Sequence, residues 1–338
     1  MAKQLGYACI NMHLRKQNIY TGRSMIRRTF DAKGLDYVSE LCIANTKDLI
    51  KIIQWNEDNG IKVFRMSSEI YPWMSEYEFV DLPGYKELCK LLKQAGDLAQ
   101  GYGQRLSFHP GQFTVLASPT QKVVDGAWNE LNKSGQIMDL MGLPRTRMAK
   151  INIHVGGAYG NKETALVRFC NNFEKLSESA KSRLTVENDD KASMYSVVDL
   201  YEGVYNRVGI PIVFDYHHHQ FCTGDLTEEQ ALKLAASTWG DVKPCTHYSE
   251  SRRREQGLIV ESFLKNSNIT LNNIGEFPTM EKLYTESQKI KVQAHSDLIV
   301  DEIKDYGLDI DVVVEAKHKE LAVQGYLNKF ENKHTKVL

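Results

Sequence analysis

The sequence predicts a single-domain α/β protein with the fold of a (β/α)8 barrel, the TIM barrel. Eight short runs of β-branched and apolar residues recur along the 338-residue chain, and amphipathic stretches separate most of them. Such alternation indicates a parallel sheet with right-handed crossovers. A count of eight strands favours closure into a barrel over an open, doubly wound sheet.

The predicted strands are short and rich in β-branched and aromatic residues. In chain order they are GYACI (6–10), KVFRMS (62–67), RLSFH (105–109), AKINIHV (149–155), RLTVE (183–187), PIVFD (211–215), PCTHY (244–248) and DVVVE (311–315). Helical spacing is clearest in two stretches between them, which align Leu88, Leu92 and Ala95, and then Val124 and Leu131, on one face. These stretches predict helices that pack against the outside of the strands.

We expect one domain over residues 1–320, because the sequence shows neither an internal repeat nor a low-complexity linker. Residues 321–338 are expected to form a C-terminal tail or a closing helix. The stretch 251–294 is long and polar between the seventh and eighth strands, so we interpret it as an elaborated loop.

The composition is that of an ordinary soluble globular protein, with 42% hydrophobic and 25% charged residues. No apolar run reaches the length of a membrane span and the N-terminus lacks the features of a secretion signal, so a cytoplasmic location is expected. The six cysteines are scattered without a Cys-x-x-Cys pair, which argues against a disulfide framework and a thiolate zinc site. Because the net charge is −1, local basic patches would have to hold any nucleic-acid partner.

Barrel enzymes carry their chemistry at the carboxyl ends of the strands. In this sequence those ends hold residue types that bind metals, namely His109, His154, Glu187, Asp215, His247 and Glu315. His218 follows Asp215 by three residues, and His295 follows the long polar stretch. A single strand-end histidine is more often a hydrogen-bonded core or surface residue, but the joint pattern favours convergence on one point.

Imidazole and carboxylate ligands together suit Zn²⁺, Mn²⁺ or Fe²⁺, and this many candidates exceed the need of one four-coordinate ion. We therefore expect two or three metal ions. Clustered ions are typical of hydrolytic displacement at phosphate, a reaction that then needs no protein nucleophile. His217 and His219 flank His218 in the sequence, and we do not expect either of them to bind a metal ion directly.

Ordered motifs around these residues resemble the UV damage endonucleases, a family related to the endonuclease IV barrels. The matching segments are LGY (5–7), FRMSS (64–68), LSFHPGQ (106–112), IHVGGAYG (153–160), VEND (186–189), DYHH (215–218) and VEAK (314–317). The resemblance implies a DNA repair hydrolase, an endodeoxyribonuclease that nicks double-stranded DNA on the 5′ side of UV photoproducts such as cyclobutane dimers and 6-4 products. An enzyme of this kind is expected to need neither a membrane nor an oligomeric partner. It is expected to lie at the nucleoid when it is bound to DNA.

The resemblance also implies divalent metal cofactors, Mn²⁺ first, with Zn²⁺ or Mg²⁺ as alternatives. Matching motifs assign a first ion to His109, His154 and Glu187. Glu187 then bridges to a second ion, whose other ligands are Asp215, His247 and Glu315. A third ion is assigned to His218 and His295. The residues implied as catalytic are Glu187, Asp215, His247 and Glu315.

Two pairs of residues match family positions that contact the lesion. Gln112 and Phe113 correspond to residues that probe the duplex opposite the damage; Phe113 replaces an expected tyrosine but keeps the stacking area. Tyr7 and Asn11 correspond to positions that border the extruded dinucleotide. A damaged dinucleotide stacks and pairs poorly, which lowers the free energy needed to flip it.

The sequence also departs from the family. Cys245 stands where relatives often have a lysine, two residues before the seventh-strand histidine, and Lys243 is the nearest substitute. Glu69 stands where some relatives have a histidine. We expect Glu69, Lys243 and Cys245 to contact the metal-ligating side chains and to hold them in position without binding the metal themselves. Candidate phosphate contacts are the basic residues Arg65, Arg145, Arg147, Lys243 and the run 252–254.

Three alternatives stay open. An endonuclease IV-like enzyme acting only at abasic sites would share the barrel and the metals but lack a two-base pocket. A sugar isomerase would use the same barrel for a monosaccharide. A damage-binding protein would recruit other factors and cut nothing, although the complete set of metal-ligand residues argues against it.

Overall fold

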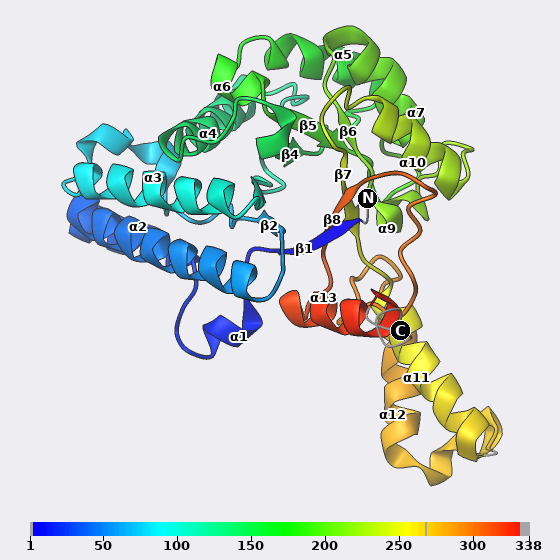
Figure 1. The fold of residues 1–338 in the computed structure, drawn as a ribbon. Coiled ribbons are helices and arrows are strands. Elements are labelled where there is room, and N and C mark those ends of the chain that lie inside the picture. Colours follow the sequence, from blue (N-terminus) through cyan, green and yellow to red (C-terminus); the bar gives the residue numbers. More distant parts are fainter. Residues whose placement is uncertain (1–2, 268, 332–338) are drawn as a thin grey trace.

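The computed structural model describes residues 3–267 and 269–331, and it confirms the predicted barrel (Figure 1). Each of the eight predicted runs overlaps a strand, and these are β1 (Gln4–Ala8), β2 (Val63–Arg65), β3 (Arg105–Ser107), β4 (Ile151–Ile153), β5 (Leu184–Glu187), β6 (Ile212–Val213), β7 (Cys245–Tyr248) and β8 (Asp311–Val314). Most strands are shorter than predicted, and β1 begins earlier. The strand ends keep their predicted positions to within a few residues.

All strand pairs are parallel, and together they close a ring. One sheet has the order β3-β2-β1-β8-β7 and the other has the order β4-β5-β6. Two isolated parallel bridges, Phe108 with Ile151 and Asp215 with His247, join the sheets at both junctions. Neighbours in sequence are therefore neighbours in space around the barrel, and all carboxyl ends open on one side.

Helices cover the outside of this ring (Figure 1). The helices of the described residues are α1 (Met12–Arg15), α2 (Arg27–Asp58), α3 (Tyr85–Gly101), α4 (Gln121–Leu140), α5 (Lys162–Phe173), α6 (Glu178–Lys181), α7 (Val197–Leu200), α8 (Asn206–Val208), α9 (Tyr216–His219), α10 (Glu228–Ser237), α11 (Arg252–Ser267), α12 (Pro278–Lys289) and α13 (Glu320–Tyr326), of which α11 and α12 stand apart from the ring. Short segments of 3₁₀ or π geometry lie at Met74–Glu76, Phe79–Asp81, Arg147–Ala149, Tyr201–Tyr205, Leu271–Glu276 and Leu327–Glu331.

The main core lies between the helices and the outward face of the strands. In α3 the predicted stripe of Leu88, Leu92 and Ala95 is buried, and it belongs to the same core as outward strand residues such as Phe64 and Leu106. Truncating one such leucine to alanine typically costs about 2–5 kcal/mol. The helical spacing therefore predicted correctly which faces meet the barrel.

The barrel interior holds a separate, smaller apolar cluster. Ala8, Val63, Val213 and Val313 point inward and pack together with Cys245. The strand Gly6 admits no side chain, because a Cβ there would lie 1.6 Å from the carbonyl oxygen of the paired Val63. Cys245 is thus a packing residue of the barrel interior.

A buried ion pair closes the amino-terminal end of the barrel. Arg105 Nη1 lies 3.0 Å from Asp311 Oδ2, and both side chains are almost completely covered. The remaining donors of Arg105 reach the backbone carbonyls of Met148, Arg147 and Lys243 at 2.7–3.0 Å. This guanidinium is fully paired, which is the condition under which a buried charge is tolerated.

The stretch 251–294 corrects the sequence expectation of a loop. It contains α11 and α12, which pack against each other and project away from the barrel as a helical arm (Figure 1). The arm has its own small core, in which the rings of Phe263 and Phe277 meet edge to face with centroids 5.2 Å apart. The polar sequence concealed two helices because most of their side chains face solvent.

Beyond β8 the chain forms α13, which packs near β1. Residues 332–338 of the predicted tail lie outside the described residues. Across the described part of the chain, none of the helices combines the length and apolarity needed to span a membrane.

Candidate metal centre

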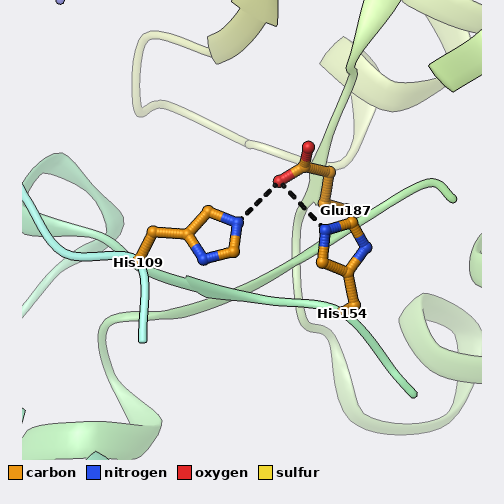
Figure 2. Close-up of side chains that lie close together, drawn as sticks. All are labelled: His109, His154 and Glu187. Atoms are coloured by element: carbon orange, nitrogen blue, oxygen red, sulfur yellow. Dashed lines mark ion pairs between the residues drawn. The ribbon is translucent and has the colours of Figure 1, made fainter. Parts of the chain in front are cut away.

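The carboxyl ends of six strands bring their predicted ligands together around Glu187. Glu187 Oε2 lies 3.3 Å from His109 Nε2, 4.0 Å from His154 Nε2 and 3.0 Å from His247 Nδ1. Figure 2 shows the two histidines that follow β3 and β4 pointing at this carboxylate. Glu187 is buried, and His109 and His154 are partly buried, so the cluster lies below the protein surface.

A first group of ligand atoms comes from His109, His154 and Glu187, all within 4.8 Å of one another. The second ring nitrogen of each histidine faces an acceptor: His109 Nδ1 lies 3.0 Å from the carbonyl oxygen of Pro110, and His154 Nδ1 lies 3.0 Å from Asp189 Oδ1. The Pro110 carbonyl oxygen can only accept, so it holds a proton on His109 Nδ1 and leaves the Nε2 lone pair facing Glu187. His154 Nδ1 makes no hydrogen bond among the described residues in spite of its closeness to Asp189, and its Nε2 also faces Glu187. Three lone-pair donors facing one point fit a divalent cation.

A second group consists of Glu187, Asp215 and His247. Asp215 caps α9, since its Oδ1 accepts the backbone N–H of His218 at 2.8 Å. Its Oδ2 is buried without a hydrogen-bond partner among the described residues, and so is His247 Nδ1. Buried polar atoms without partners are costly, and a metal ion would satisfy both.

The other three predicted ligands lie at the rim of these groups. Glu315 Oε1 is 3.4 Å from His247 Nδ1, and His218 Nδ1 is 3.4 Å from Glu187 Oε1. His295 Nδ1 is 3.8 Å from Glu315 Oε2 and belongs to neither group. All eight residues singled out as ligands from the sequence therefore converge on one region, while their binding of metal stays a prediction.

The charges in this cluster are strongly coupled. Burial raises the pKa of Glu187 and Glu315, but the facing groups, first His247 for Glu187 and Arg65 for Glu315, bring both pKa values well below the ordinary range. Burial raises the pKa of Asp215 to about 8, with His218 opposing the shift and Glu187 adding to it. Burial lowers the pKa of His154, yet Glu187 and Asp189 bring it up to about 9.

Three residues that the sequence did not reveal as neighbours of the ligands hold them in place. The guanidinium of Arg65 forms an ion pair with Glu315, and the Asn152 amide donates to Glu187 Oε2. Lys150 is fully buried, and its Nζ lies 3.0 Å from His247 Nε2. The sequence could have revealed Lys150 and Asn152, because side chains alternate along a strand and residues 150, 152 and 154 therefore share the inward face at β4.

The expected supporting residues fall in different places. Lys243 does not reach the cluster, since its Nζ pairs with Asp309 at 2.8 Å and Asp311 at 3.0 Å at the opposite end of the barrel. Glu69 is exposed and lines a cavity of about 600 Å³ together with Phe113. The lysine beside His247 is Lys150, which precedes β4.

The two pairs assigned to the lesion differ in exposure. Phe113 is 82% exposed and Gln112 is exposed next to it, on the loop that follows β3. Tyr7 and Asn11 are buried instead: Tyr7 Oη donates to Asn56 Oδ1 at 2.7 Å and accepts from Asn11 Nδ2 at 2.9 Å. Asn11 Oδ1 also caps α1. Tyr7 and Asn11 thus support the loop after β1, while their place beside an extruded dinucleotide stays a prediction.

Most of the expected phosphate contacts are engaged within the protein. Arg145 pairs with an aspartate at 2.7 Å, Arg252 with Asp297 at 3.5 Å and Arg254 with Asp301 at 2.7 Å. Arg65 is committed to Glu315. These pairs reduce the positive charge that the side chains offer to DNA.

Comparison with known proteins supports the same assignment as the site. The family model of UV-endonuclease UvdE matches residues 3–336. The chain is 33% identical over 341 residues to the UV-damage endonuclease of Schizosaccharomyces pombe, covering 97% of this chain and 51% of that protein. It is 32% identical over 287 residues to the UV DNA damage endonuclease of Bacillus velezensis, covering 83% of this chain and 78% of that protein. The chain spans about half the length of the fungal relatives it matches.

Solved structures extend the comparison to the fold. SacUVDE superposes with a TM-score of 0.78 at 26% identity and full coverage of both chains. Endonuclease IV from Thermus thermophilus has a TM-score of 0.55 at 11% identity, covering 96% of this chain and 98% of that one, a likeness of fold alone. The chain belongs to the UV-endonuclease UvdE family.

Proposed function

We propose that this protein is a metal-dependent endonuclease that nicks double-stranded DNA on the 5′ side of UV photoproducts. The observation that carries the proposal is the convergence of eight His, Asp and Glu side chains at the carboxyl end of the barrel, five of which form two groups with ligand atoms within 4.8 Å of one another. Among these atoms, Asp215 Oδ2 and His247 Nδ1 are buried and lack hydrogen-bond partners among the described residues. Family membership supports DNA as the substrate.

The donor set suits two or three divalent ions, with Mn²⁺ as the first candidate. His109, His154 and Glu187 would hold one ion, and Glu187 with Asp215, His247 and Glu315 would hold a second. His218 and His295 would serve a third. When bound, such ions supply activation of water and stabilisation of charge on the phosphate.

The chain's own residues would orient these ligands. Arg65 holds the Glu315 carboxylate, and Asn152 holds that of Glu187. Lys150, next to His247 Nε2, limits rotation of that ring. Partners of this kind typically contribute about 10–100-fold in metal affinity or activity.

Gln112 and Phe113 would enter the duplex where the damaged dinucleotide turns outward. Their loop lies directly after His109, so probing and cleavage sites are linked by a few residues. Exposure of the Phe113 ring favours stacking on a base. The weakened stacking of a dimer would make flipping easiest at the lesion, so damage would be recognised as deformability.

Incision of matched duplexes tests the proposal. One duplex carries a single cyclobutane dimer, one carries an abasic site, and one is undamaged, each assayed with Mn²⁺, Mg²⁺ or Zn²⁺. We expect a nick 5′ to the dimer that depends on the metal. Cutting at the abasic site alone would support the endonuclease IV-like alternative, binding without cutting would support a damage-binding protein, and aldose-ketose turnover without DNA cleavage would support an isomerase.

A further inference from the structure

His295 reaches the metal centre by a different route from the other candidate ligands. The rest lie at strand ends or, in the case of His218, in the short helix α9 directly after β6. His295 instead follows the arm formed by α11 and α12, in a segment without a helix or strand of its own. Its position therefore depends on how residues 293–298, here called the return segment, are attached.

The return segment is tied to the base of the arm by backbone contacts. Ser251 and His295 form an antiparallel bridge. The backbone N–H of Arg252 donates to the carbonyl oxygen of Ala294 at 2.7 Å, and that of Ser296 donates to the carbonyl oxygen of Glu250 at 2.7 Å. The first turn of α11 thus runs alongside the segment that carries His295.

One side chain adds to this attachment. Glu255, in the first turn of α11, is 7% exposed, and its two carboxylate oxygens accept the consecutive backbone N–H groups of Asp297 and Leu298, each at 2.8 Å. A carboxylate that accepts two backbone N–H groups makes strong, directional bonds. Glu255 therefore fixes the backbone two residues beyond His295.

On the other side, His217 lies against the return segment. His217 Nε2 is 3.1 Å from the carbonyl oxygen of Gln293, two residues before His295, and the rings of His217 and His295 have centroids 5.5 Å apart. The backbone is thus held on both sides of His295.

Arg252 also pairs with Asp297 Oδ2 of the return segment at 3.5 Å, and the backbone N–H groups of Lys317 and His318 donate to the carbonyl oxygens of Ser296 and Asp297. Among the side chains that hold the segment, Glu255 is buried and binds two consecutive backbone N–H groups without contacting His295, so it is the one to change.

We propose that Glu255 is a positioning residue that sets His295 over the metal centre, so that occupancy of the metal site served by His295 depends on the base of the arm. This inference rests on the proposed metal role of His295. It assigns the arm a function at its base, in addition to any contact that its outer surface makes. Without Glu255, two backbone N–H groups lose their acceptor and the return segment gains freedom to move His295 away from Glu315.

The test compares Glu255→Ala, Glu255→Gln, His295→Ala and the Glu255→Ala/His295→Ala double variant, each in the whole 338-residue chain. Mn²⁺ binding at equilibrium is the first readout, and incision of a dimer-containing duplex is the second. Glu261→Ala is the matched control, since Glu261 is an exposed glutamate on the same helix. Circular dichroism and thermal unfolding show whether each variant folds.

We expect Glu255→Ala to lower the affinity for the most weakly bound Mn²⁺ and to slow incision by about 10–100-fold. Glu255→Gln should cause a smaller loss of both, because it keeps one acceptor oxygen. On the His295→Ala background the same substitution should add nothing, because the two residues would act through one site. Equal losses on both backgrounds, or unchanged Mn²⁺ binding in a folded Glu255→Gln variant, would overturn the proposal. If the parent protein binds Mn²⁺ without cutting DNA, the proposed function fails, and the Mn²⁺ measurements still decide the role of Glu255.

Discussion

Replacing Glu187 by glutamine tests the metal centre most directly, because this carboxylate lies between the two groups of ligand atoms. Its Oε2 is 3.0 Å from His247 Nδ1 and 3.3 Å from His109 Nε2, and its Oε1 is 3.4 Å from His218 Nδ1. Glutamine keeps the shape of the side chain and removes its negative charge. The first group of ligand atoms would then retain only two imidazoles and a neutral amide.

The size of the effect follows from what the ions are expected to contribute. Metal ions typically stabilise the charge of a transition state by several kcal/mol. Since about 1.4 kcal/mol corresponds to a tenfold change in rate, a loss of about 4 kcal/mol predicts incision slower on the order of a thousandfold. Hydrogen bonds to a charged group contribute about 1.5–3 kcal/mol to folding, less than the usual stability of a domain, so the variant should fold.

Equilibrium dialysis with Mn²⁺ and incision of a dimer-containing duplex are the assays. We expect Glu187→Gln to bind at least one fewer Mn²⁺ per chain and to lose incision, while circular dichroism stays unchanged. Glu261→Gln, an exposed change of the same chemistry on α11, is the control. Full incision together with an unchanged Mn²⁺ count in Glu187→Gln would refute the bridging assignment.

Three further predictions address other parts of the molecule. Phe113→Ala should lower the preference for damaged over undamaged duplex by about 5–150-fold, because stacking on a base contributes about 1–3 kcal/mol. The thermal stability of the variant should be unchanged, since the ring is 82% exposed. Competition binding with both duplexes measures the preference, and an equal preference in the parent protein and the variant would contradict the probing role. Asp311→Ala should lower the free energy of unfolding by about 3–5 kcal/mol, because it leaves the buried Arg105 unpaired, and urea titration would detect it; a change under about 1 kcal/mol would contradict this account. Mn²⁺ affinity should rise with pH between about 6 and 9, because without metal Asp215, with its pKa raised to about 8, and His154, with its pKa raised to about 9, hold protons at pH 7 that metal binding must displace. Calorimetry in buffers of different ionisation enthalpy would measure that proton release, and its absence at pH 7 would show that these groups are already deprotonated.

The fold was predictable because strands and helices of a barrel leave different spacings in the sequence. Short runs of β-branched and apolar residues marked each strand, because most strands are buried on both faces: residues such as Leu106 and Val312 pack against the helices, and Val63 and Val313 pack in the barrel interior. The arm was missed for the corresponding reason. Its helices pack chiefly on each other, through contacts such as that between Phe263 and Phe277, so no broad apolar face distinguishes them from a polar loop.

The resemblance to the family identified which residues to consider, but it did not show what those residues contact in this chain. It assigned Tyr7 and Asn11 to the lesion, which stays a prediction, but it gave no sign that both side chains are buried and hydrogen-bonded to each other. It also directed attention to Lys243 in place of a lysine beside the seventh-strand histidine. Lys243 lies before β7, at the end of the barrel away from the metal centre, and pairs with Asp311 there.

The sequence by itself determined which side chains stand at the carboxyl ends of the strands, because in a parallel barrel the end of each strand can be located along the chain. Only the tertiary structure decided which residues support them. Lys150 and His247 are 97 residues apart and meet because closure of the ring brings the inward faces of β4 and β7 together. Glu255 and the segment carrying His295 meet because the arm folds back on its own base. Contacts of this kind depend on ring closure and chain reversal, which leave no periodic signal in the sequence.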